Sequence, residues 1–163
     1  MRRRTSLALA TMAALALAGC ATTPPPAPIT DTAARTPQLS TLTRLVNEAG
    51  LADTLRGAGP FTVFAPSDEA FKAVPAATLA ELARDKERLR AVLTYHVVPG
   101  KLTAADVKTA AVKTVNGANI ALSRAGTFVT VEDAVVQTAD VAATNGVVHV
   151  IDRVLMPPAP PRR

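Results

Sequence analysis

Residues 59–71 join an apolar extended segment to the start of a helix. Successive side chains of a strand point to opposite faces, and here both faces are largely apolar, with Phe61 on one and Phe64 on the other. This pattern is typical of a buried strand. Pro66 stops the strand, and the serine that follows can cap a helix in which Phe71 returns toward the core. The segment predicts the hydrophobic centre of the molecule.

Apolar positions at helical spacing predict three further helices in the first half of the chain. They extend from an N-cap at Ser40 to Gly50, over residues 51–56, and from a capping box at Thr78 and Glu81 to Leu93. The charged face of the last of these helices is most simply a solvated surface.

The pattern changes to short strands in the second half. Strands are predicted at 95–98, 112–115, 120–123, 128–132, 135–138 and 147–155, with a helical turn at 102–107. Asn116 and Gly117 favour a tight hairpin because both positions tolerate positive φ, and a second turn is predicted at 144–146. Helices come first and antiparallel strands follow, so the predicted fold class is α+β.

The composition limits both the size and the partners of the protein. A chain of 163 residues with 48% apolar side chains suggests a single domain and leaves no room for a second large module. The formal charge of +5 includes Arg2, Arg3 and Arg4, and without them 15 of the 18 basic residues remain against 13 acidic ones. Because this excess is small and no basic cluster lies beside aromatic side chains, nucleic acid is not expected as a partner.

The N-terminus has the features of an export signal. A basic start precedes an apolar run, residues 7–18, that is too short to span a bilayer comfortably, so residues 1–19 are predicted to be a signal peptide. Residues 17–20 resemble the bacterial lipobox, in which Cys20 takes the lipid. Lipidation explains an unpaired cysteine in an exported protein. An ordinary secretory signal with an incidental cysteine is the alternative.

The same segment predicts where the protein resides. Two or three acyl chains anchor a lipoprotein firmly, so the protein is expected to be exported and tethered to a bacterial membrane through Cys20. In a Gram-negative host, Ala21 after the cysteine implies the outer membrane. Residues 20–37, rich in proline, threonine and alanine, are predicted to be an extended spacer. A domain at 38–157 and a proline-rich tail at 158–163 follow.

The sequence contains few residues suited to catalysis. His96 and His149 are the only histidines, Cys20 is assigned to lipid, and no serine stands in a nucleophile elbow. Two histidines without clustered cysteines or carboxylates lack the spacing of a metal site. No catalytic residue, metal or cofactor is therefore predicted, and His149 is expected to be a hydrogen-bonded strand residue.

Three segments in order, residues 59–71, 93–100 and 144–157, resemble the first box, the Tyr-His motif and the second box of fasciclin domains. The resemblance covers about residues 38–157. It implies a β-wedge of two small sheets packed against several helices, with the two boxes as neighbouring central strands. The structural positions of these motifs are Phe61, Phe64, Pro66, Phe71, Asn145, Gly146 and His149.

The resemblance also implies a function in adhesion, through binding of a protein or polysaccharide at a cell surface or in a matrix. In animal members, the Tyr-His motif and an Asp-Ile pair are linked to integrin binding. The matching residues are Tyr95, His96, Asp140 and Val141. This sequence departs from the fuller animal motif at residues 138–139.

Two alternatives to this function remain open. The first is that Tyr95 and His96 form hydrogen bonds inside the fold and that Asp140 shapes a turn, since buried polar groups normally have structural partners. The second is that the protein carries a small apolar ligand, such as a carotenoid or a lipid. An apolar cleft between the helices and the sheet would favour the second alternative.

Overall fold

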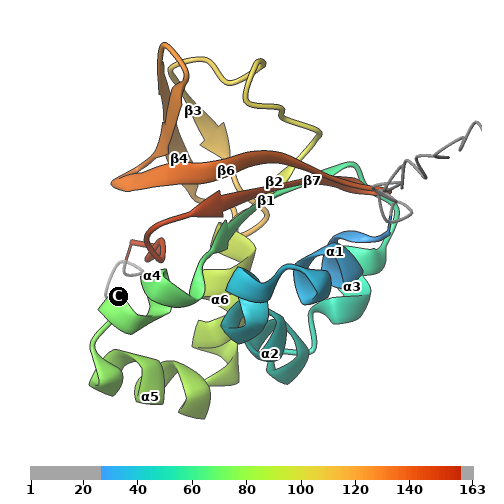
Figure 1. Ribbon diagram of the computed structural model, residues 1–163. Coiled ribbons are helices and arrows are strands. Elements are labelled where there is room, and N and C mark those ends of the chain that lie inside the picture. Colours follow the sequence, from blue (N-terminus) through green and yellow to red (C-terminus); the bar gives the residue numbers. More distant parts are fainter. Residues whose placement is uncertain (1–26, 159–163) are drawn as a thin grey trace, which may run out of the picture.

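The computed structural model describes residues 27–158. Helices form one layer and a strongly bent sheet forms the other (Figure 1). The predicted signal peptide, Cys20 and the first part of the predicted spacer lie outside the described residues, as does the tail beyond Pro158. The α+β fold class is confirmed.

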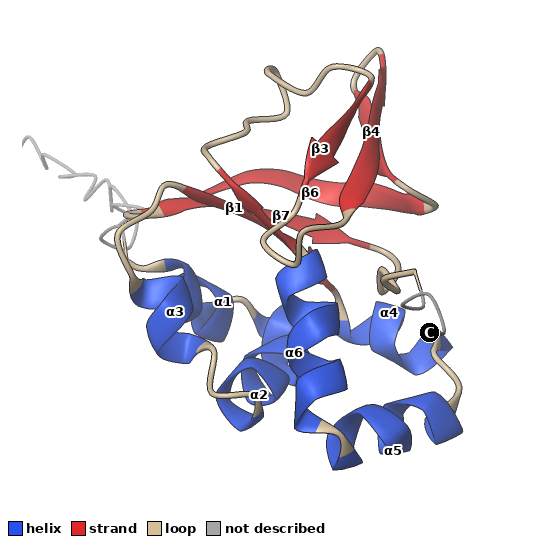
Figure 2. Cartoon of the chain, turned by 180° about the vertical axis from the view of Figure 1, so that it is seen from behind, coloured by secondary structure: helices blue, strands red, loops and turns tan. Residues whose placement is uncertain are grey.

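The helical layer is built mainly from the first half of the chain. Its elements are α1 (Ile29–Arg35), the 3-10 helix η1 (Pro37–Leu39), α2 (Ser40–Glu48), α3 (Ala52–Arg56), α4 (Asp68–Ala73), α5 (Ala76–Arg84) and α6 (Lys86–Tyr95). Helix α6 lies at the centre of this layer, with α1 to α3 on one side and α4 and α5 on the other (Figures 1 and 2).

The strands form one hydrogen-bonded array in the order β2-β1-β7-β6-β5-β4-β3. Their bounds are β1 (Phe61–Pro66), β2 (Val97–Pro99), β3 (Ala110–Lys113), β4 (Asn119–Ala125), β5 (Phe128–Val131), β6 (Ala134–Ala143) and β7 (Gly146–Ile151). Strands β1 and β7 are parallel neighbours, and the other pairs are antiparallel. The prediction that the two boxes are neighbouring central strands is confirmed.

Strand β6 joins the two halves of the wedge. Its first residues pair with β5, and the rest of the strand pairs with β7. Register shifts on either side of Thr138 bend the strand, and Asp140 lies in the second shift with a φ of 57°. The extra residues of such a bulge increase the local twist. The prediction of a turn at Asp140 is therefore wrong, because the residue lies inside a bulged strand.

The two edge strands of the array approach each other. The amide N–H of Val115, just beyond β3, donates to the carbonyl of Val97 in β2 at 2.8 Å. This bond links the two ends of the strand order, so the wedge is nearly a barrel. The two small sheets predicted from the resemblance are the two halves of this continuous array.

Strand β1 separates two hydrophobic clusters. Val63 and Ala65 belong to the cluster shared with the helices, whereas Phe64 belongs to the cluster inside the wedge. On the neighbouring strand β7, Val148 and Val150 pack with the helices. Both faces of β1 are thus buried, as the sequence pattern predicts.

The predicted spacer is wrong for its last part. Residues that were assigned to it form α1, in which Ile29 and Ala33 lie one turn apart and are buried in the core. The amide N–H of Ile29 donates to the side chain of Asn145 at 2.9 Å, and the carbonyl of Ala27 accepts from Thr144. Tertiary contacts therefore order a segment whose proline-rich and threonine-rich composition is typical of an extended chain.

Two predicted helix starts are also wrong. Ser40 is the first residue of α2 rather than its N-cap, and its hydroxyl donates to the carboxylate of Asp68. The predicted long helix from Thr78 is two helices, because Asp85 ends α5 and caps α6 by accepting from the amides of residues 87 and 88. Helix α5 begins before Thr78, without the predicted capping box.

Candidate binding site

Asn145, in the turn between β6 and β7, connects three segments of the fold. Its side-chain oxygen accepts from Ile29, and its amide donates to the carbonyls of Leu55 at 2.6 Å and Gly57 at 3.1 Å. The next residue, Gly146, has no room for a side chain, since an added Cβ would collide with the carbonyl of Phe61. Both second-box residues therefore hold the start of the parallel pair together.

His149 is fully internal. Its ring stacks on Phe64 with a centroid distance of 5.5 Å. Nδ1 accepts from the amide of Asp140 at 3.2 Å, and Nε2 donates to the carbonyl of Leu102 at 2.8 Å. The side chain is 1% exposed. It thus links β7, the bulge in β6 and the loop after β2, in agreement with the predicted hydrogen-bonded strand histidine.

His96 follows α6 and is held in the same way. Nδ1 donates to the carbonyl of Val92 at 2.8 Å, and Nε2 accepts from the amide of Leu155 at 2.9 Å. Burial lowers the pKa of His96 to about 4, although the hydrogen bond to Val92 opposes this shift. The imidazole is therefore neutral near pH 7 and ties the C-terminal segment to α6.

Tyr95 is the last residue of α6 rather than part of a strand. Its hydroxyl donates to the carbonyl of Asn119 at 3.3 Å. Burial, with a smaller contribution from the negative charge of Glu132, raises the pKa of Tyr95. The Tyr-His motif therefore lies inside the fold and forms the hydrogen bonds expected from the structural alternative.

The Asp140 and Val141 pair lies on a different part of the molecule. The exposed carboxylate of Asp140 accepts from the amide of Ala104 at 2.8 Å, and Val141 is half-buried against the helix-side cluster. Asp140 is thus joined to His149 and the loop after β2, whereas Tyr95 contacts β4. Of these four residues, Asp140 presents a polar group to solvent.

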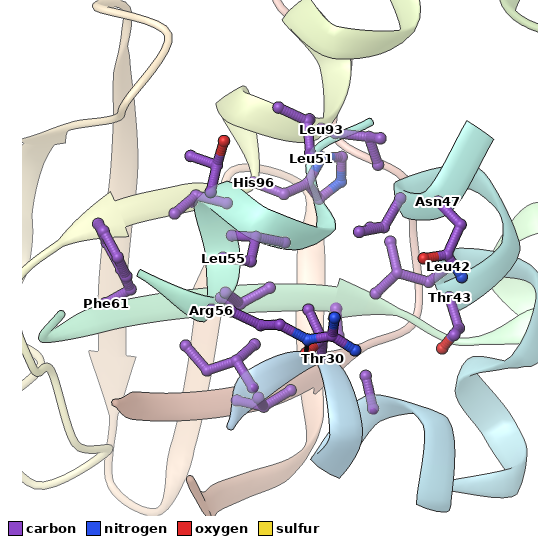
Figure 3. A pocket seen from close by; sticks show the side chains of 18 of the residues that line it. Thr30, Leu42, Thr43, Asn47, Leu51, Leu55, Arg56, Phe61, Leu93 and His96 are labelled. Atoms are coloured by element: carbon purple, nitrogen blue, oxygen red, sulfur yellow. Dashed lines mark hydrogen bonds between the residues drawn. The ribbon is translucent and has the colours of Figure 1, made fainter. Parts of the chain in front are cut away.

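An apolar cavity lies between α1, α2, α3 and the helix-side face of β1 (Figure 3). Its volume is about 130 Å³. The apolar lining includes Leu42, Val46, Leu51, Leu55, Phe61 and Val63. An engineered dry cavity of about 150 Å³ binds benzene, so this one can hold an apolar group of similar size. A whole carotenoid does not fit in this volume.

Polar side chains gather on one side of the cavity. Arg56 extends toward Thr30 in the close view (Figure 3). Its Nε donates to the hydroxyl of Thr30 at 3.1 Å, and one terminal nitrogen contacts the carboxylate of Asp31 at 3.3 Å. The side chains of Arg56 and Asp31 are 53% and 43% exposed. The cavity thus has an apolar interior and a charged, solvent-reaching margin.

Most walls of this cavity follow from the sequence, but the cavity itself does not. The apolar faces of α2, α3 and β1 follow from their periodicity. The wall formed by α1 was hidden in the predicted spacer, although Ile29 and Ala33 have helical i, i+4 spacing. A void depends on how side chains from several elements meet, so no single periodic pattern encodes it.

In residues 27–158, no group of three or more His, Cys, Asp or Glu side chains is placed to hold a metal ion. None of the helices in that part of the chain combines the length and apolar character needed to cross a bilayer.

Helices packed on a nearly closed wedge, with the first and last strands parallel at its centre, define the class of this fold. Residues 37–157 match the fasciclin domain family, and the chain therefore belongs to that family. A solved structure of a FAS1 domain pair from the insect cell adhesion molecule Fasciclin I is similar, with a TM-score of 0.62 and 28% identity. The match covers 75% of this chain and 46% of that one.

Several bacterial proteins are similar in sequence. Protein sll1483 of Synechocystis is 46% identical over 132 residues, which cover 80% of this chain and 73% of the relative. Immunogenic protein MPB70 of Mycobacterium bovis is 38% identical, with 81% and 70% covered. Cell surface glycolipoprotein MPB83 of the same species is also 38% identical, with 81% of this chain and 61% of that protein covered.

Proposed function

We propose that this protein is an exported, membrane-anchored binding module of the adhesion type. The observation that carries the proposal is the match of residues 37–157 to the fasciclin domain family. A cell adhesion molecule has the same fold, and a relative is named a cell surface glycolipoprotein. Both names support a surface location and a binding role for this chain, with a protein or a polysaccharide as the partner.

The two buried histidines support a binding function rather than a catalytic one. His96 and His149 are 2% and 1% exposed, and both ring nitrogens of each are used in hydrogen bonds within the fold. A general base needs a nitrogen within reach of a substrate proton. We therefore assign these histidines to the scaffold and the function to its surface.

Phe128 is the side chain best suited to contact a partner. It lies at the tip of the β4–β5 hairpin and is 68% exposed, the most of the exposed large apolar residues in the described chain. Aromatic side chains dominate the energetics of many protein interfaces. Asp140 is a second exposed candidate, retained from the animal motif.

Adhesion of whole cells tests this proposal. Deletion of the gene is expected to lower attachment to a protein-coated or polysaccharide-coated surface, and the native gene is expected to restore it. Restoration by a Phe128→Ser variant should be incomplete, whereas a Phe128→Tyr variant keeps the aromatic ring and should restore attachment. Equal attachment of the deletion strain and its parent would refute the adhesion function.

The anchor is tested separately from adhesion. Lipidation at Cys20 predicts that the native protein sediments with membranes and that a Cys20→Ser variant is found in the soluble fraction. Export of the Cys20→Ser variant as a soluble protein would still support the signal peptide. Membrane association of both forms would contradict a lipid anchor at Cys20.

A second candidate function is the binding of a small apolar ligand, and the cavity of about 130 Å³ favours it. Xenon or benzene at this site would perturb the NMR signals of methyl groups in its lining, such as those of Leu42 and Val46. A Val46→Phe variant fills the space and should lose this response. Signals that do not change in the native protein would rule out an accessible cavity.

A further inference from the structure

The charged margin of the cavity points to a particular class of ligand. Among the described residues that line the cavity, Arg56 carries the only permanent positive charge, and the interior is largely apolar. The planar guanidinium matches a carboxylate in two parallel hydrogen bonds. An apolar interior beside one arginine is therefore complementary to a molecule with an apolar chain and one carboxylate.

We infer that the cavity binds a fatty acid, with its apolar chain inside and its carboxylate on Arg56. This inference rests on the second candidate function, which needs only an apolar group in the cavity. It adds the headgroup of the ligand and the residue that recognises it. The existing contact of Arg56 with Asp31 shows that a carboxylate can reach the guanidinium at this position.

The Asp31 carboxylate is an exchangeable partner for Arg56. Its oxygen lies 3.3 Å from the guanidinium, longer than a typical ionic hydrogen bond of about 2.7–2.9 Å, and both side chains are about half exposed. Exposed pairs of this kind contribute little to stability. A ligand carboxylate can therefore take the place of Asp31 at small cost.

Entry of an acyl chain requires one wall of the cavity to move. Helix α1 has seven residues and no side-chain hydrogen bond at its N-cap. Helices this short depend on tertiary contacts rather than on their own stability. The cavity of about 130 Å³ is close to the size needed for benzene, so an eight-carbon chain requires a wall to move. We expect α1 to be the wall that moves, because it carries the Asp31 whose place the ligand carboxylate takes.

Titration with octanoate and octanol tests the headgroup. Octanoate is expected to bind the native protein near pH 7 more tightly than octanol. An Arg56→Gln variant should lower the affinity for octanoate about tenfold, the loss of one charge-assisted contact, and change the affinity for octanol less than twofold. An Asp31→Asn variant should bind octanoate more tightly than the native protein.

Arg44 provides the matched control. It is an exposed arginine paired with Glu48 on α2 and does not line the cavity. An Arg44→Gln variant removes one positive charge from the same layer, so its octanoate affinity should equal that of the native protein. Equal losses in the Arg44 and Arg56 variants would reduce the effect to net charge and overturn the inference.

The remaining outcomes distinguish the fatty acid inference from the second candidate function on which it rests. Binding of octanol and octanoate with equal affinity, unaffected by Arg56→Gln, would overturn the fatty acid inference and keep the apolar cavity as a binding site. Binding of neither compound would overturn the second candidate function as well. Amide hydrogen exchange of α1 should become faster with octanoate than with octanol, and unchanged exchange would refute the moving wall.

Discussion

Phe64 and Phe128 place the same side chain in opposite surroundings. Phe64 is 0% exposed and stacks on His149, whereas Phe128 is 68% exposed. A Phe64→Ala variant is expected to lose about 3–5 kcal/mol of unfolding free energy, because it loses buried contacts and leaves a cavity. A Phe128→Ala variant should lose less than about 0.5 kcal/mol. Urea unfolding of both variants measures the difference, and similar losses would show that the core is misplaced.

His96 makes the stability of the fold depend on pH. Its pKa is about 4 in the folded protein and 6.5 in an ordinary environment, so between these values the unfolded chain binds a proton that the folded protein does not. The contribution of His96 to the unfolding free energy is fully present above pH 6.5 and is lost as pH falls through this window. The loss approaches about 3 kcal/mol near pH 4. Protonated Nε2 could no longer accept from the amide of Leu155.

Urea unfolding at pH 7 and at pH 4.5 measures this loss. Hydrogen bonds from Ser40 and Thr41 outweigh burial and lower the pKa of Asp68 from 3.8, so this carboxylate titrates below the histidine window. A His96→Gln variant is less stable at pH 7 but should show a flatter dependence between the two pH values. A slope as steep as that of the native protein would assign the pH dependence to other groups.

Helix α2 is capped by a residue from another helix. The Asp68 carboxylate, at the start of α4, accepts from the hydroxyl of Ser40 at 2.6 Å and from the amide of Thr41 at 2.8 Å. An Asp68→Ala variant should lose about 1–2 kcal/mol of unfolding free energy, the usual effect of removing a cap. Asp53, exposed in the first turn of α3, is the control, and Asp53→Ala should cost less than about 1 kcal/mol. Equal unfolding midpoints for the two variants would contradict the interhelical cap.

This cap also shows what the sequence could and could not predict. The buried strand at β1, the following helix capped by Ser67 and the hairpin after β3 follow from local rules, and the structure contains them. The start of α2 depends on Asp68, which is distant in sequence, and the bulge in β6 depends on pairing with two different strands. Local patterns locate elements well but do not contain such long-range contacts.

The candidate site also has features that the sequence predicts and features that it does not. The sequence predicted that His149 is a hydrogen-bonded strand residue on the face opposite Val148 and Val150, but not that its partners are residues 102 and 140. The apolar faces that line the cavity were predictable one helix at a time. The charged pair at its margin joins α1 to α3, and the position of α1 depends on its packing against β6 and β7, which are distant in sequence.

At the scale of the whole molecule, α1 forms part of the hydrophobic core although it precedes the residues matched to the family. Removal of residues 21–36 should therefore destabilise a domain whose family motifs are all intact. Burial of Ile29 accounts for about 1.5–3 kcal/mol, and the hydrogen bond that its amide donates to Asn145 adds about 1 kcal/mol. The expected loss is about 2.5–4 kcal/mol of unfolding free energy.

Comparison of two truncations measures this effect at the scale of the fold. A chain that begins at residue 27 keeps α1 and is the control for one that begins at Pro37. The shorter chain should unfold at a lower urea concentration and, because one wall of the cavity is gone, should expose Leu42 and Val46 to apolar dyes. If both chains unfold at the same midpoint and bind dye equally, α1 is an appendage rather than a wall, and the predicted spacer would extend to residue 37 after all.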